Sequence, residues 1–316
     1  MSMSRFPAIE VNDALAAGWS QLARQGCLAV GAALPRAECK RLAEHVDTTL
    51  AEAERRVAGA AEGCAREAAE EEHFGTVRSR EQRYDLKLPL CPVVREAVRS
   101  VVGRLAVVLE QAVSRQGELV ELACLVSDPG ARRQPLHADT PCATGPSRPG
   151  ANADARPLLT VFAALQDISP HMGPTLLCPC SHEPEAHELL EQVRPEELTT
   201  DAVLERHGAV AATVAAGTAV LMDSRLLHGG GANAPHEAGG ARRRLLYTTW
   251  RLPLERAGCE AGEKANGSCS LRAELEGKFC LADFLSPAAA GRPERSCSRS
   301  PRRVRSIGLG ARAGVT

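Results

Sequence analysis

Hydrophobic positions recur at helical spacing in the first third of the chain and at strand spacing afterwards. Residues 36–55, which follow Pro35, and residues 94–116 carry apolar side chains three or four positions apart, so both predict amphipathic helices. A shorter helix is expected over residues 14–25, because Gly26 is typical of the position just after a helix. The Ala/Glu-rich residues 60–72 predict either a solvated helix or a mobile segment.

Residues 83–88 alternate polar and apolar side chains, which is the pattern of a half-buried strand. Short apolar runs bounded mostly by Gly and Pro turns predict further strands at 27–30, 119–126, 158–167, 175–178, 210–214, 218–222, 226–228 and 243–251. Helical insertions are expected at 183–193 and 196–206. We therefore predict a mainly β protein with N-terminal helices and a closed core of the jelly-roll or cupin-like type.

The composition of the chain limits the classes of protein to which it can belong, but it does not indicate a reaction. The chain has 316 residues, of which 44% are hydrophobic, so a sizeable core is expected. Its net charge of -1 and its 3% aromatic content do not favour binding to nucleic acid, and none is expected. No apolar run is long enough to predict a membrane span, and the N-terminus lacks the apolar segment of a signal peptide.

Twelve cysteines are scattered along the chain, and in the absence of a signal peptide they predict free thiols and a cytoplasmic protein, with an organelle left open. Residues 286–316 are rich in Arg and Ser with few apolar positions, so a disordered tail is expected. Residues 1–285 are interpreted as one domain, with the β core at about 118–252. The sequence does not predict the oligomeric state.

The candidate chemistry starts at His137 and Asp139, because side chains two apart on an extended segment point to the same side. An imidazole and a carboxylate that face one point form two thirds of a metal site, and His228 is the candidate for the third ligand. Two His and one carboxylate on one face of a metal are typical of non-haem iron(II) oxygenases. Most single histidines are instead surface or hydrogen-bonded residues, so the triad needs its context.

That context is a series of short motifs between about Val11 and Leu252 through which the chain resembles the phytanoyl-CoA dioxygenase family of iron(II)- and 2-oxoglutarate-dependent oxygenases. The motifs in chain order are Gln134-x-x-His137-x-Asp139, Gly173-Pro174-Thr175, Pro179-x-Ser181-His182, Gly217-Thr218-Ala219-Val220-Leu221 and His228-Gly229-Gly230-Gly231-Ala232-Asn233, followed by an Arg that opens a last strand. The resemblance implies a double-stranded β-helix (jelly-roll) core. It also implies that His137, Asp139 and His228 ligate Fe(II).

The resemblance further implies an Arg that anchors 2-oxoglutarate, the co-substrate, just beyond the distal His. Arg242, Arg243 and Arg244 compete for this role. Counting back from Trp250 favours Arg243, with Arg244 as the runner-up, because a guanidinium binds a carboxylate through two parallel hydrogen bonds. Of two further candidates for co-substrate binding, Gln134 is equally expected to bind a ligand or to hold its strand, and Thr160 would act from a neighbouring strand.

The implied reaction is hydroxylation of a small molecule by dioxygen, with decarboxylation of 2-oxoglutarate to succinate. Arg83, Tyr84 and Lys87 are candidates for substrate binding or for strand-edge charges that face water, and His182 is a candidate loop cap. Two positions depart from the family pattern: Cys180 stands where Gly is common, and Gly230 where some members have Ser. The substrate stays open, and so do two alternatives, a catalytically silent jelly-roll binding protein with a basic tail and a cupin-like isomerase.

Overall fold

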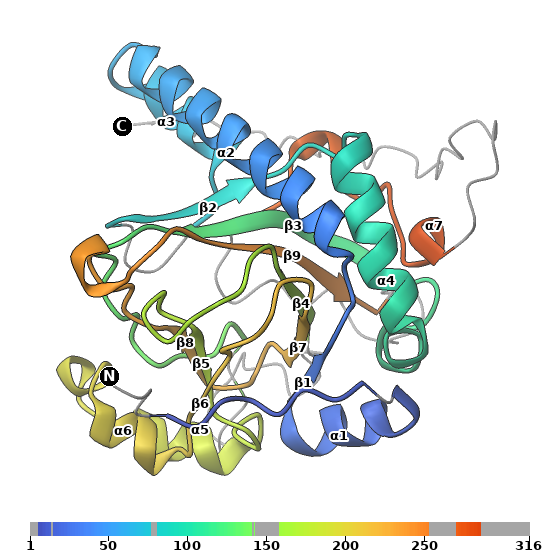
Figure 1. The fold of residues 1–316 in the computed structure, drawn as a ribbon, viewed down its shortest axis with the longest axis vertical. Helices are drawn as coiled ribbons and strands as arrows, with labels where there is room; N and C mark the ends of the chain where they lie inside the picture. Colours follow the sequence, from blue (N-terminus) through green and yellow to red (C-terminus); the bar gives the residue numbers. More distant parts are fainter. Residues whose placement is uncertain are drawn as a thin grey trace, which may run out of the picture.

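The strands of the computed structural model form two sheets in which every pair of neighbouring strands is antiparallel (Figure 1). The structure describes residues 6–13, 15–76, 81–140, 142, 158–252 and 270–285. The larger sheet has the order β1-β7-β4-β9-β3-β2 and the smaller one β6-β5-β8. The strands are β1 Cys27–Val30, β2 Arg83–Lys87, β3 Glu118–Ser127, β4 Leu159–Ala164, β5 Thr175–Leu177, β6 Val210–Ala211, β7 Ala219–Asp223, β8 His228–Gly230 and β9 Arg243–Arg251.

Helices lie outside these sheets, and α2 and α4 cover the larger one (Figure 1). The α-helices are α1 Gly18–Gln25, α2 Arg36–Gly59, α3 Cys64–His73, α4 Pro92–Val113, α5 Pro184–Glu191, α6 Asp201–Arg206 and α7 Ala282–Leu285. Short 3-10 helices occur at Leu15–Ala17, Pro195–Glu197, His236–Ala238 and Ala273–Leu275. None of the helices that the structure describes is long and apolar enough to cross a membrane.

Strand β9 shows how the larger sheet divides the core into two sides. Leu246 and Trp250 belong to the apolar cluster that includes α2 and α4, whereas Leu245 and Tyr247 belong to a second cluster that faces the smaller sheet. This alternation follows from the two-residue repeat of a strand. Odd-numbered residues of β9 from Arg243 onward therefore face the space between the sheets.

Most predicted elements are present with small shifts of their ends. The strand predicted at 243–251 is observed with the same ends, and Gly26 ends α1 in the left-handed conformation at φ 71°. Of the two alternatives predicted for residues 60–72, the solvated helix is observed, because most of them form α3, which is largely exposed and contacts α2 and β2. The strand predicted at Leu226 begins at His228 instead, because the Leu226 amide closes a turn onto the Asp223 carbonyl.

Other expectations fall partly or wholly outside the described residues. One of these is the tail expected at 286–316, all of which lies outside them. The nine cysteines within the described ranges are all free, as the sequence predicted.

Candidate metal centre

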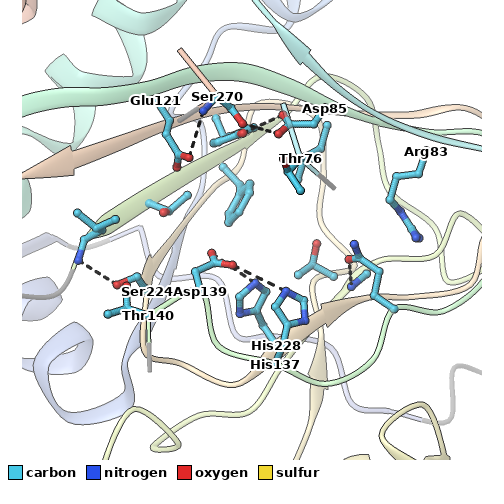
Figure 2. Close-up of a pocket in the computed structure, with 18 of the residues that line it drawn as sticks. Thr76, Arg83, Asp85, Glu121, His137, Asp139, Thr140, Ser224, His228 and Ser270 are labelled. Carbon is cyan, nitrogen blue, oxygen red and sulfur yellow. Dashed lines mark hydrogen bonds and ion pairs between the residues drawn. The ribbon is translucent and has the colours of Figure 1, made fainter. Parts of the chain in front are cut away.

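The structure brings His137, Asp139 and His228 together at one wall of a cavity between the two sheets (Figure 2). Their ligand atoms all lie within 4.8 Å of one another. Asp139 Oδ1 is 3.8 Å from His137 Nε2, and Asp139 Oδ2 is 3.7 Å from His228 Nε2. Since β8 carries His228 and the backbones of the two His residues exchange both hydrogen bonds, the smaller sheet fixes their spacing.

The hydrogen bonds of both imidazoles turn the same nitrogen, Nε2, toward the shared metal position. His137 Nδ1 lies 2.7 Å from the Pro135 carbonyl oxygen, and His228 Nδ1 lies 2.9 Å from the Leu226 carbonyl oxygen. A carbonyl oxygen only accepts, so Nδ1 carries the hydrogen in each neutral ring and Nε2 keeps its lone pair. Backbone carbonyls that orient metal-binding imidazoles in this way are a general feature of metal sites.

This donor set fits iron(II). Two neutral imidazoles and one carboxylate on one side of a point match the 2-His-1-carboxylate set and leave the side toward the cavity open for other ligands. Asp139 is held in place because its backbone amide donates to the Ser224 carbonyl, while 45% of its side chain is exposed. The residues present therefore suit the metal that the sequence predicted.

The three consecutive arginines at the start of β9, of which Arg242 directly precedes the strand, do not share one environment. Arg243 is 2% exposed and lines the cavity. Arg244 forms two hydrogen bonds with the Asp47 carboxylate of α2, at 2.7 and 2.8 Å, and Arg242 forms two with Asp128, at 2.6 and 2.7 Å. Of the two residues predicted to anchor 2-oxoglutarate, only Arg243 lines the cavity, and Arg244 is engaged on the opposite face of the strand.

Arg243 carries a buried positive charge that has no carboxylate partner in the described part of the chain. One Nη atom donates to the Gly173 carbonyl, and Nε has no hydrogen-bond partner among the described residues. Burial, followed by the positive charge of Arg83, lowers the pKa of Arg243 to about 9. An unpaired guanidinium in a cavity is physically suited to bind a carboxylate.

Gln134 and Thr160 also line the cavity, but each is already hydrogen-bonded to protein. Gln134 Oε1 accepts from the Gly230 amide at 2.8 Å, which agrees with a role in holding β8. The Thr160 hydroxyl lies 3.0 Å from that of Thr249. A Cβ atom at Gly230 would lie 2.7 Å from Gln134 Oε1, so the Ser that some family members have here would require the Gln134 side chain to move.

Opposite the triad, the cavity wall is acidic, which the sequence analysis did not predict (Figure 2). Asp85 of β2 is 3% exposed and accepts hydrogen bonds from the Tyr247 and Ser270 hydroxyls. Glu121 of β3 accepts from the Thr249 hydroxyl at 2.6 Å. The sequence held one sign of this acidic wall: Asp85 lies two residues after Arg83 on a predicted strand, so both side chains face the same side. Nothing in the polar stretch around Ser270 indicated that Ser270 would line the cavity.

The remaining candidates occupy different surroundings. Arg83 is buried in the cavity wall, whereas Tyr84 and Lys87 line a neighbouring groove beside α3. His182 is buried outside the cavity, where its Nε2 lies 3.2 Å from the Ala23 carbonyl, as expected of a residue that fixes a loop. The insertions at 183–206 contribute no side chain to the part of the cavity wall that the structure describes.

Several solved structures are similar to this one at low sequence identity. HygX from Streptomyces hygroscopicus, solved with nickel, 2-oxoglutarate and hygromycin B bound, is 14% identical, with a TM-score of 0.49 over 74% of this chain and 85% of that one. EctD from S. alaskensis with bound Fe is 19% identical, with a TM-score of 0.48 over 79% and 82%. SnoK, a non-haem α-ketoglutarate-dependent carbocyclase from nogalamycin biosynthesis, is 17% identical, with a TM-score of 0.47 over 78% and 91%.

Sequence comparison gives the family. No curated protein matches the chain significantly. The family model of phytanoyl-CoA dioxygenase matches residues 22–238, which is more than half of the chain and includes all three residues of the triad. The chain therefore belongs to the phytanoyl-CoA dioxygenase family and is an enzyme of the non-haem iron, 2-oxoglutarate-dependent class.

Proposed function

We propose that this enzyme hydroxylates a small molecule and converts 2-oxoglutarate to succinate and carbon dioxide in the same reaction. Residues 1–285 would act as one dioxygenase domain, in which the two facing sheets correspond to a jelly-roll core. His137, Asp139 and His228 would hold iron(II), and Arg243 would hold the distal carboxylate of 2-oxoglutarate. The proposal fits a cavity of about 380 Å³, which lies within the roughly 300–1,000 Å³ range of small-molecule sites.

One observation carries this proposal: the triad and the unpaired Arg243 guanidinium line the same cavity. A site that only held a structural metal would have no need of a buried charge without a counter-ion, which costs several kcal/mol. The carboxylate of 2-oxoglutarate would neutralise that charge. The same charge is an argument against a cupin-like isomerase, because an isomerase would not need Arg243 to bind 2-oxoglutarate.

The chain's own residues have three tasks in this reaction. The triad presents two Nε2 lone pairs and one carboxylate while it leaves the cavity side open. Iron(II), when bound there, supplies the redox chemistry that links decarboxylation of 2-oxoglutarate to oxidation of the substrate by dioxygen. Arg243 orients the co-substrate, and the apolar wall residues Leu125, Leu158 and Phe162 limit access of water.

The test is an anaerobic titration of the purified protein with iron(II) and then with 2-oxoglutarate. We expect a saturable visible charge-transfer band from the chelated co-substrate. Asp139→Ala should abolish the band, and Arg36→Gln, which changes an exposed ion pair with Asp167, should not affect it. A folded, iron-loaded protein without the band would refute the proposed function.

A further inference from the structure

Strand β2 places a positive and a negative side chain next to each other in the wall of the cavity. Arg83 and Asp85 are two residues apart, so both point to the same side of the strand, and both are 3% exposed. In Figure 2 both side chains border the open space of the cavity, with Asp85 across that space from the triad. This pair is distinct from Arg243, which lies on β9.

Among the residues that the structure describes, Arg83 has no counter-ion. Its only hydrogen bond joins Nη2 to the Gly231 carbonyl at 3.2 Å, and its Nε and Nη1 atoms have no partner among the described residues. Burial lowers the pKa of Arg83 to about 10, so the side chain stays charged at neutral pH. A buried guanidinium with two unused donor atoms is suited to an anionic group of a ligand.

The described part of the chain offers no counter-ion to Asp85 either. Its two oxygens accept from the neutral hydroxyls of Tyr247 and Ser270, and none of its ion pairs or hydrogen bonds within the described ranges involves a basic side chain. Burial is the main cause that raises the pKa of Asp85 to about 7, and the negative charge of Glu121 adds to it. A second negative side chain close to Asp85 makes this end of the cavity favourable for a cation.

The two charges do not neutralise each other, because no hydrogen bond or ion pair joins Arg83 to Asp85. Each therefore stays unpaired in a buried wall, an arrangement that costs free energy and is typical of binding sites rather than of cores. A ligand that carried one group of each sign would satisfy both. Such a ligand need not be large, because residues two apart on a strand lie roughly 6–7 Å apart.

We propose that the primary substrate belongs to the amino-acid class, a small molecule with a carboxylate and an amine. Arg83 binds its carboxylate, and Asp85, with Glu121 beside it, binds its ammonium group. The inference rests on the proposed function, since the substrate would then lie across the cavity from the iron-binding triad. Arg83, Asp85 and Glu121 are specificity-determining residues in this scheme and take no part in the chemical step.

The surroundings of the cavity agree with a cationic group in the substrate. A groove between α2, α3 and residues 271–276 lies next to the cavity and shares the lining residues Thr76, Arg83 and Asp85 with it. Acidic side chains outnumber basic ones along this groove; they are Glu54, Glu67, Glu70, Glu71, Glu72, Asp85, Glu274 and Glu276, against Arg66, Arg83, Lys87 and Arg272. Such an excess raises the local concentration of cations.

The experiment measures binding of four matched probes to the full-length protein loaded anaerobically with iron(II) and saturated with 2-oxoglutarate, so that Arg243 is already occupied. The probes are γ-aminobutyrate, butyrate, butylamine and butanol, and isothermal titration calorimetry gives their dissociation constants. We expect γ-aminobutyrate to bind at least tenfold more tightly than butyrate or butylamine. Equal affinities for the four probes would overturn the inference without any variant.

Two variants then assign the charges. Asp85→Asn should weaken γ-aminobutyrate at least tenfold and leave butyrate unchanged, whereas Arg83→Gln should weaken γ-aminobutyrate and leave butylamine unchanged. Arg36→Gln and Asp167→Asn, which change an exposed ion pair of the same residue types, should alter none of the four affinities. If Arg83→Gln instead raises the 2-oxoglutarate concentration needed for the visible band, Arg83 serves the co-substrate and the inference fails. Loss of the band from the wild type would refute the proposed function itself, which is a separate result.

Discussion

Replacing Arg243 by Met should change co-substrate affinity and protein stability in opposite directions. Met removes the charge and keeps an unbranched side chain, so the wall of the cavity stays apolar and filled. In the wild type the unliganded protein holds a buried guanidinium that pairs with no carboxylate of the described residues. The variant loses the group that would bind 2-oxoglutarate, and it also loses the cost of burying a charge.

The magnitudes follow from the surroundings of Arg243. Burial lowers its pKa from 12.5 to about 9, and at 1.36 kcal/mol per pKa unit this corresponds to a cost of roughly 5 kcal/mol in the free energy of unfolding. The folded pKa lies below the unfolded one, so the cost is fully present at pH 7 and disappears only as the pH rises above about 9. Loss of the hydrogen bond to Gly173 offsets about 1 kcal/mol.

The expected loss of affinity is also large. Removing one partner of a buried ion pair costs about 3–5 kcal/mol, which corresponds to roughly 10²–10⁴-fold in the dissociation constant of 2-oxoglutarate. Without ligand, the variant should unfold at a temperature at least as high as that of the wild type. With 2-oxoglutarate at about 100 times its dissociation constant, the wild type gains roughly 2.7 kcal/mol, and the variant at the same concentration should gain almost nothing.

The assay combines thermal unfolding with the anaerobic charge-transfer titration. Arg242→Gln and Arg244→Gln are the matched controls, because they break ion pairs with Asp128 and Asp47 outside the cavity. They should lower the unfolding temperature and leave 2-oxoglutarate binding unchanged. Unchanged binding by Arg243→Met would refute the reasoning, and a larger loss in Arg244→Gln would move the anchor to that residue.

Three further predictions concern other residues of the cavity. His228→Ala should abolish iron(II) binding while circular dichroism shows an intact fold, and bound iron in the variant would exclude His228 as a ligand. Gly230→Ser should displace Gln134, because its Cβ would lie 2.7 Å from Oε1, and should cost about 1–3 kcal/mol in denaturant unfolding; wild-type stability would show that the strand adjusts. Asp85 has a folded pKa of about 7 against 3.8, so its contribution to stability should fall as the pH rises from about 4 to 7. Asp85→Asn should remove this fall, and equal pH profiles of the two proteins would contradict it.

Local pattern predicted much of this fold, and the reasons are visible in single elements. Strand β9 was predicted with its observed ends because Arg243 to Arg251 combines β-branched, aromatic and apolar residues. The same two-residue repeat, counted back from Trp250, favoured Arg243 over Arg244, and Arg243 is the one that lines the cavity. The triad was predicted because His137 and Asp139 are close in sequence and because the family motif includes His228.

The rest depends on contacts between distant parts of the chain. The acidic wall joins Asp85 to Tyr247 and Ser270, which are 162 and 185 residues away, and no local pattern encodes such pairs. The ion pairs of Arg242 and Arg244 depend on distant partners in the same way. Arg242 binds Asp128, which follows β3, and Arg244 binds Asp47 of α2. The Ala/Glu-rich segment was ambiguous alone because its helix is stabilised by packing against α2.

The position of Ser270 has an evolutionary consequence. The family match ends at residue 238, yet Arg243, Tyr247 and Ser270 all contribute to the cavity beyond that point. The part of the chain that the family model recognises thus contains the metal ligands, and the part that follows completes the wall opposite them. In the proposed scheme, changes at Tyr247 and Ser270 would alter the hydrogen bonds that position Asp85 and would leave the iron ligands in place. This segment is therefore one place where a change of substrate preference would begin.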